Sequence, residues 1–263
     1  MAAPKEKELV PVMIVFDTET GGLKCRKVGV CQICMHSVRL DTFERTGVLN
    51  LYIQPYNKKT DFEKPKKKGL KTKFEIEDEK NDVGELLEYS ESAYKVHGLT
   101  LDFLRNNGVP YEEAARKVVD FVAGARISSG KNGAPFLVGQ NVLFDVGMIQ
   151  QVLEYAGLWE EFCKHVRGSE DFHGEFQPLI LDTMTLAWLA LCNSNIPSYE
   201  LGKICEALGI EIDDAHDADS DVTATEEIVR IFTTRMRSSS SGDEEDSGMV
   251  ENRREKKREH FRI

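Results

Sequence analysis

The first 55 residues contain three stretches whose apolar and polar positions predict β-strands. The stretches are Val10–Thr18, Val28–Leu40 and Gly47–Pro55, and each is rich in β-branched and other apolar side chains. The segments between them are short, which favours antiparallel pairing of neighbouring strands. We therefore expect the chain to begin with antiparallel strands that follow one another directly.

From residue 99 the period changes to that of amphipathic helices, with short apolar strands among them. The predicted helices comprise 99–107, 110–126, 142–158, 184–192, 198–210 and 219–236, and the predicted strands comprise 134–141 and 178–183. Thr100 and Ser198 are expected N-caps, and Gly157 is an expected C-cap. Strands first, then strands alternating with helices, predict an α/β protein with a mixed sheet covered by helices.

Two segments break this pattern. Residues 56–92 are dense first in lysine and then in acidic residues, and we interpret them as an inserted surface segment with a short helix near 84–94. Its lysines either lie in a solvated loop or contact phosphates, and both interpretations stay open. Residues 238–263 are rich in Ser and Gly, then acidic, then basic, which predicts a disordered tail. The domain itself is expected to span residues 8–237.

Composition narrows the class of protein. The chain has 263 residues, 41% of them hydrophobic, and a net charge of 34 − 45 = −11. Such an acidic chain is a poor candidate for non-specific coating of DNA, although metal ions in an acidic site would reverse the local sign. No apolar run reaches the roughly 18 residues of a membrane span, and the N-terminal residues lack the apolar core of a signal peptide. Six scattered cysteines favour a reducing compartment, so we expect a cytoplasmic protein with no membrane partner.

Two of these cysteines, Cys31 and Cys34, form a C-x-x-C pair inside a predicted strand. A zinc site normally needs a second pair of ligands, and the other four cysteines stand singly. We interpret Cys31 and Cys34 as buried structural thiols.

The stretch "IVFDTETGGL" supplies the first candidate chemistry. Asp17 and Glu19 are two residues apart at the end of an apolar strand, so both side chains project from the same face. Two carboxylates this close repel each other unless a cation lies between them, and Mg²⁺ prefers such oxygen ligands. The alternative is a polar turn made by Gly21 and Gly22.

Further acidic residues stand at the starts of later helices. Asp145 lies in the first turns of a helix that follows a buried strand, among apolar neighbours that disfavour an unpaired charge. His216 and Asp221 lie in "HDADSD", where a loop is expected to lead into the last helix. Each of these features is weak alone, because an Asp near a helix N-terminus is common.

Together, "FDTETGGL", "GQNVLFD" and "HDADSD" resemble, in this order, the motifs of the DEDDh family of 3′→5′ exonucleases. This family includes the proofreading epsilon subunit of bacterial replicative polymerases. The softer stretches "AYKVHGLT" and "LDTMTLA" are also similar to it, and the resemblance covers about residues 10–236. It implies a ribonuclease H-like fold with a mixed five-stranded central sheet flanked by helices.

The resemblance also implies a set of site residues and a cofactor. Two divalent ions, Mg²⁺ or Mn²⁺, would be held by four carboxylates, and His216 would act as general base. Backbone groups of Thr18 and Thr20 would lie near the 3′ end of the substrate, Leu23 would wedge against the terminal base, and Asn141 would position substrate or Asp145. The implied metal ligands are Asp17, Glu19, Asp145 and Asp221.

The expected function is hydrolysis of DNA from its 3′ end to mononucleotides, by a proofreading or a free-standing enzyme. The expected partners are single-stranded DNA or a frayed 3′ end, and a DNA polymerase or replication factor. Two alternatives stay open. One is an RNA-trimming exonuclease of the same fold, which differs in how its pocket treats the 2′-OH. The other is a catalytically silent nucleic-acid-binding module, which the full set of acidic residues makes the weaker hypothesis.

Overall fold

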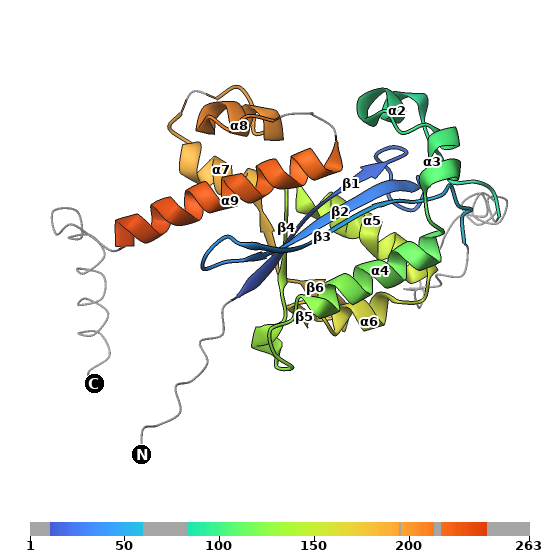
Figure 1. Ribbon diagram of the computed structural model, residues 1–263, viewed down its shortest axis with the longest axis horizontal. Helices are drawn as coiled ribbons and strands as arrows, with labels where there is room; N and C mark the ends of the chain where they lie inside the picture. Colours follow the sequence, from blue (N-terminus) through green and yellow to red (C-terminus); the bar gives the residue numbers. More distant parts are fainter. Residues whose placement is uncertain (1–10, 60–83, 195, 213–216, 241–263) are drawn as a thin grey trace, which may run out of the picture.

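A mixed five-stranded sheet forms the centre of the molecule (Figure 1). The computed structural model describes residues 11–59, 84–194, 196–212 and 217–240. In the order β3-β2-β1-β4-β7, the strands span Arg45–Tyr52, Val30–Arg39, Val12–Thr20, Phe136–Gly139 and Ile180–Asp182. The first three pair antiparallel, as predicted, while β4 pairs in parallel with β1 and β7 pairs in parallel with β4. The predicted α/β class and the five-stranded sheet are confirmed.

Strand β1 is the centre of this sheet because it is apolar on both faces. Its residues from Val12 to Phe16 are all buried, which is typical of a strand covered on both sides. Ile14 and Phe16 belong to one hydrophobic core, and Met13 and Val15 belong to a second core on the opposite face. The apolar character ends at Asp17, so the carboxyl end of the strand is where charged side chains begin.

Helices cover the two faces of the sheet (Figure 1). On one face lie α4 (Tyr111–Gly124), α5 (Val142–Tyr155) and the short α6 (Trp159–Cys163). On the other lies α9 (Ala218–Ser240), with α7 (Thr183–Leu191) and α8 (Leu201–Leu208) packed beside it. Helices α2 (Glu91–His97) and α3 (Leu101–Asn107) lie beyond the carboxyl end of β1 (Figure 1).

The helix ends follow local sequence signals in most places. The Thr100 side chain accepts a hydrogen bond from the Phe103 amide and caps α3, as predicted. Gly157 adopts the left-handed conformation just after α5, as expected of a glycine that ends a helix. Ser198 does not cap α8, because that helix begins later, after Glu200, without a side-chain cap. Helix α9 continues to Ser240, four residues beyond the expected end at Met236.

The described ends of the charged segment pack against the core. Tyr56 and Leu87 are buried, and the backbone of Lys58 pairs with that of Glu85. The helix predicted near 84–94 is wrong in its position. Residues 84–90 make isolated bridges to neighbouring segments, and α2 starts only at Glu91, after the Ser90 cap. Leu87 packs in the hydrophobic core. An exposed helix over these residues would keep its side chain out of the core.

Four small elements carry no prediction from the sequence. They are the 3-10 helix η1 (Lys131–Gly133), the helix α6, and a separate hairpin of β5 (Gly168–Glu170) and β6 (Phe176–Pro178). The hairpin strands are only three residues long, so no alternation was long enough to find. Most of the tail predicted from 238 lies outside the described residues. Among the helices that the structure describes, none has the length and apolarity to cross a membrane.

Candidate functional site: a carboxylate cluster at the end of strand β1

Three carboxylates converge where β1 leaves the sheet. Asp17 and Glu19 project from the face of β1 that α9 covers, and Asp221 reaches them from the first turns of α9. One oxygen from each of Asp17, Glu19 and Asp221 lies within 4.8 Å of the others. The structure thus brings together residues that are about 200 positions apart in the sequence.

Packing beneath the start of α9 determines where Asp221 lies. Ala218 and Val222 are fully buried against Met13 and Val15 of β1. The Asp221 amide donates to the Asp217 carbonyl at 3.0 Å, so the residue belongs to the first helical turn. Ala218 and Val222 pack α9 directly against β1. Asp221 lies between them in the sequence, so its carboxylate points to the end of β1.

A fourth carboxylate, Asp145, approaches from the other face of the sheet. Strand β4 runs parallel to β1 and ends at Gly139, and Asn141 then adopts a left-handed backbone conformation with φ 54°. Asparagine tolerates this conformation better than most residues. The sharp turn starts α5 at once and places Asp145 in its first turn.

Thr18 holds the Asp145 carboxylate against β1. Its amide donates to Asp145 Oδ1 at 3.0 Å and its hydroxyl donates to the same oxygen at 2.5 Å. Asp145 is 3% exposed, and Thr18 is also buried. Asp145 interacts electrostatically with both Asp17 and Glu19, so it belongs to the same charged centre.

Burial and mutual repulsion raise the pKa values of these acids. Desolvation raises the pKa of Glu19 to about 8, and the charges of Asp221, Asp145 and Asp217 add to the effect. The pKa of Asp17 is raised well above its usual range by burial and then by Asp145, Glu19 and Asp221. Burial also raises the pKa of Asp145, although the two hydrogen bonds from Thr18 oppose the shift.

This donor set fits divalent cations. Converging carboxylates destabilise one another when they are ionised, and a cation between them removes that repulsion. Carboxylate oxygens are the ligands that Mg²⁺ and Mn²⁺ prefer. The three oxygen atoms lie within 4.8 Å of one another, so a single cation can contact all of them.

The residues predicted to bind substrate lie on the segments that carry these carboxylates, in or just after β1 and just before α5. Leu23 is 87% exposed three residues after the end of β1. Thr20 is buried, and its hydroxyl donates to the Gly22 carbonyl at 2.7 Å. The backbone N–H of Asn141 donates to Asp182 Oδ1 at 3.1 Å. Thr18 directs its amide and hydroxyl to Asp145, so its polar hydrogens orient that carboxylate.

One predicted site residue, His216, lies outside the described residues. The structure places three further residues near the carboxylates, and the sequence analysis proposed no role for them. His97 lies within hydrogen-bond distance of the Thr20 carbonyl, with 3.3 Å between Nε2 and the oxygen. Asp182 caps α7, and Asp217 contributes to the field at Glu19. His97 and Asp182 fall in the two softer stretches of the resemblance, which was the available signal for them.

A second cluster lies next to the first. Cys34 is the cross-strand partner of Asp17, and with His36 and Asp219 it forms a group whose ligand atoms lie within 4.8 Å of one another. Cys31 and Cys34 are buried, as predicted. The missed signal was His36, two residues after Cys34 and therefore on the same strand face.

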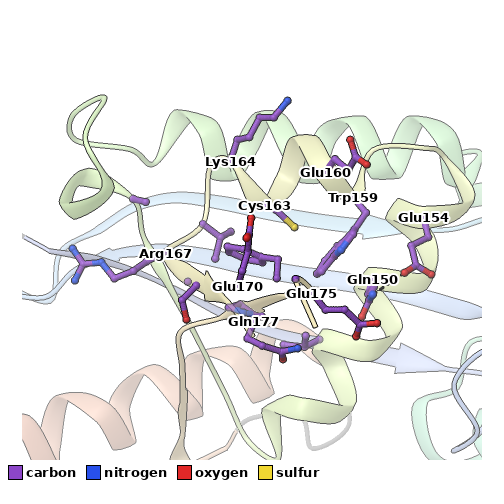
Figure 2. Close-up of a pocket in the computed structure, with 18 of the residues that line it drawn as sticks. Gln150, Glu154, Trp159, Glu160, Cys163, Lys164, Arg167, Glu170, Glu175 and Gln177 are labelled. Carbon is purple, nitrogen blue, oxygen red and sulfur yellow. Dashed lines mark hydrogen bonds between the residues drawn. The ribbon is translucent and has the colours of Figure 1, made fainter. Parts of the chain in front are cut away.

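A large hollow in the described structure lies elsewhere. It measures 950 Å³, and Figure 2 shows it bordered by Gln150 and Glu154 of α5 and by Trp159 of α6. None of the four carboxylates of the site lines it. Acidic and basic side chains alternate around it, so its charge favours no class of ligand.

The fold resembles that of E. coli exonuclease I. The structure of that enzyme with a dT13 oligonucleotide matches with a TM-score of 0.60 and 18% identity, over 86% of this chain and 42% of the other. A zinc-bound complex with single-stranded DNA matches with a TM-score of 0.59 and 18% identity, over 86% and 41%. An ExoI/SSB-Ct complex matches with a TM-score of 0.58 and 17% identity, over 86% and 42%.

These likenesses confirm the predicted ribonuclease H-like fold. At such identity they show the fold alone, and the chain spans less than half the length of the exonuclease I structures. No protein-family model matches the sequence, and no curated protein matches it.

Proposed function

We propose that the chain is a metal-dependent exonuclease that hydrolyses DNA from the 3′ end and releases mononucleotides. The observation that carries the proposal is the convergence of Asp17, Glu19 and Asp221 within 4.8 Å, beside a buried Asp145. These are the four carboxylates of the DEDDh resemblance, and they come from three separate elements. Acidic side chains on an ordinary protein surface stay exposed and apart from one another, whereas these are largely buried and converge on one point.

Asp17, Glu19, Asp145 and Asp221 would hold the metal. Two divalent ions held there would supply activation of the attacking water and stabilisation of the departing 3′ oxygen in an in-line displacement. Thr18 has an orienting role, because both of its hydrogen bonds end on the Asp145 oxygen. His216 is proposed to take the proton from the water, since it precedes Asp221 by five residues in the family pattern.

Exposed apolar side chains at the rim of the site suit the end of a nucleic-acid strand. Leu23 follows β1, and Leu143, which is 68% exposed, lies in the first turn of α5, two residues before Asp145. Apolar side chains at a nuclease site can pack against the flat face of a terminal base. We propose Leu23 for that contact, together with backbone groups of Thr20, and Asn141 as a positioning residue.

DNA is the proposed substrate and RNA the alternative. Solved exonuclease I complexes contain dT13 and dA16 oligonucleotides, and a similar backbone supports the same use here. A non-catalytic binding module is the weaker proposal, because it would not need four repelling carboxylates at one point. A proofreading role and a polymerase or replication-factor partner stay proposals from the resemblance.

The test is degradation of 5′-labelled single-stranded DNA. We expect a descending ladder of products, loss of turnover in EDTA, and recovery with Mg²⁺ or Mn²⁺. Asp17→Asn should lose nearly all turnover while it stays folded, because it removes one ligand and changes few contacts. Asp120→Asn, an exposed acid on α4, is the matched control and should keep wild-type rates. Wild-type turnover by Asp17→Asn would overturn the proposal. Faster degradation of RNA than of DNA of the same sequence would favour the RNA-trimming exonuclease.

A further inference from the structure

The second cluster joins strand β2 to the start of helix α9. Cys34 and His36 lie on the face of β2 that α9 covers, and both side chains are fully buried. Asp219, whose side chain is 44% exposed, reaches them from the first turn of α9. The group therefore combines one sulfur, one nitrogen and one oxygen ligand at the edge of solvent.

The three ligand atoms already lie at the spacing of a tetrahedral zinc site. Usual Zn–S, Zn–N and Zn–O lengths imply separations of about 3.4–3.6 Å between ligand atoms. Cys34 Sγ is 3.5 Å from Asp219 Oδ1 and 3.9 Å from His36 Nε2, and that nitrogen is 3.0 Å from the same oxygen. These separations bracket the expected ones, so a zinc ion needs shifts of only a few tenths of an ångström.

The other nitrogen of His36 has the partner that a metal-binding imidazole usually has. His36 Nδ1 lies 3.2 Å from Glu226 Oε2, and Arg45 donates to that same oxygen from Nε at 3.1 Å and from a terminal nitrogen at 2.9 Å. A carboxylate on Nδ1 holds the proton there and leaves the Nε2 lone pair for a metal. Arg45 prevents Glu226 from turning away, so the orientation of the ring is set from two sides.

A hydrogen-bond network without metal is the competing account. It needs a charged imidazole between Asp219 and Glu226, with the Cys34 thiol as an extra donor. That account treats the Cys34 thiol as one more donor to Asp219, whereas a zinc ion would use the sulfur, nitrogen and oxygen atoms together. The surroundings also favour a cation, because Asp17 and Asp217 lie near Cys34 and add negative charge.

We propose that Cys34, His36 and Asp219 form a zinc site, with a solvent ligand on the open side of Asp219. Sulfur and imidazole ligands select Zn²⁺ over the hard ions that suit an all-carboxylate site. The site would fasten α9 to β2 two residues before Asp221. It is separate from the ions of the proposed function.

Cobalt substitution of the full chain tests this proposal. Co²⁺ bound to a thiolate gives a charge-transfer absorption in the near ultraviolet, which cobalt on carboxylates alone does not give. We expect the purified protein to contain zinc, and the cobalt-exchanged protein to show this band at one equivalent. Cys34→Ser should remove the band, and His36→Gln should weaken cobalt binding by at least tenfold.

Two variants serve as matched controls. Cys31→Ser removes the other cysteine of the pair, which lies near Tyr56 and Tyr89 instead, and should keep the band. Asp17→Asn should also keep it, which separates this site from the proposed catalytic ions. Asp219→Asn changes a partly exposed residue and should fold, so it tests the ligand set if the buried variants do not fold. A wild-type protein without the band, or a band that survives Cys34→Ser, would overturn the proposal.

Discussion

Thr18 is the residue on which the orientation of Asp145 depends. Its hydroxyl and its amide donate to one oxygen of that carboxylate, and both residues are buried. Thr18→Val keeps the shape of the side chain and removes only the hydroxyl donor. Because the loss of such outer contacts usually costs about 10–100-fold in metal affinity or activity, we expect a decrease of that size in turnover at low Mg²⁺.

Titration with Mg²⁺ measures this effect. The amide bond from Thr18 persists in the variant, so a high metal concentration should restore part of the rate. Thr46→Val is a suitable control, because the Thr46 hydroxyl pairs with Ser37 at the far end of β2 and contacts no carboxylate. Equal Mg²⁺ dependence in wild type and Thr18→Val would contradict the orienting role.

His216 is the second test at this scale. A positioned general base contributes about 10²–10⁴-fold, so His216→Ala should slow single-turnover hydrolysis by that order. The rate of the wild type should rise as pH increases through the pKa of the base, because only neutral imidazole accepts a proton, and this rise should flatten in the variant. His173→Ala, in the loop of the β5–β6 hairpin, is the control. The same rate and pH profile in wild type and His216→Ala would exclude the histidine as base.

Among the elements, the pairing of the two described ends of the charged segment leads us to expect that residues 60–83 can be removed without unfolding the domain. The Lys58 amide donates to the Glu85 carbonyl at 2.8 Å, and the Gly84 amide donates to the Lys58 carbonyl at 3.2 Å. The two described ends therefore lie side by side, as in a hairpin. Replacing residues 60–83 by about four Gly and Ser residues should leave the melting temperature and the turnover of short oligonucleotides within about twofold of wild type.

The same variant separates the two readings of the lysines. If they contact phosphates, the deletion raises KM and lowers the salt dependence of KM, because fewer counterions are released. Replacing Lys66, Lys67 and Lys68 by Gln should then reproduce the change in KM with the segment in place. A deletion variant that no longer folds would show that the segment belongs to the domain.

At the scale of the whole molecule, the site makes stability depend on pH and metal. The folded-state pKa of Glu19 is about 8 against an ordinary 4.5, so its ionisation costs stability in the folded protein. This loss of stability is absent below the ordinary pKa of 4.5. It grows as pH rises and levels off above the folded-state pKa of about 8. In EDTA the melting temperature should therefore fall between about pH 5 and pH 8.

Scanning calorimetry of wild type and Glu19→Gln measures this cost. The variant should lose several °C less over the same pH interval, and Mg²⁺ should stabilise the wild type more at pH 8 than at pH 5. Other acids titrate in both proteins, so the difference between the two curves is the measured quantity. Parallel curves of melting temperature against pH would mean that folding does not raise the pKa of Glu19.

Local patterns in the chain were enough to predict most of the elements and the candidate acids. Branched residues of β1, the Thr100 cap and the stripe of α4 are local signals, and each element formed near its predicted place. The D-x-E spacing puts Asp17 and Glu19 on one face of any strand, whatever surrounds it. Small elements such as the β5–β6 hairpin escaped prediction because three residues carry no period.

Which of these residues come into contact depends on long-range packing, which local patterns do not encode. Asp221 joins Asp17 because α9 seats Ala218 and Val222 on β1, and Asp145 joins them because β4 pairs in parallel with β1. The burial that raises the pKa of Glu19 is also a property of the packed chain. Likewise, Cys34 and His36 are neighbours on one strand face, but Asp219 reaches them across 183 positions of sequence. Local sequence sets direction along a strand or helix, and long-range packing sets distance between them.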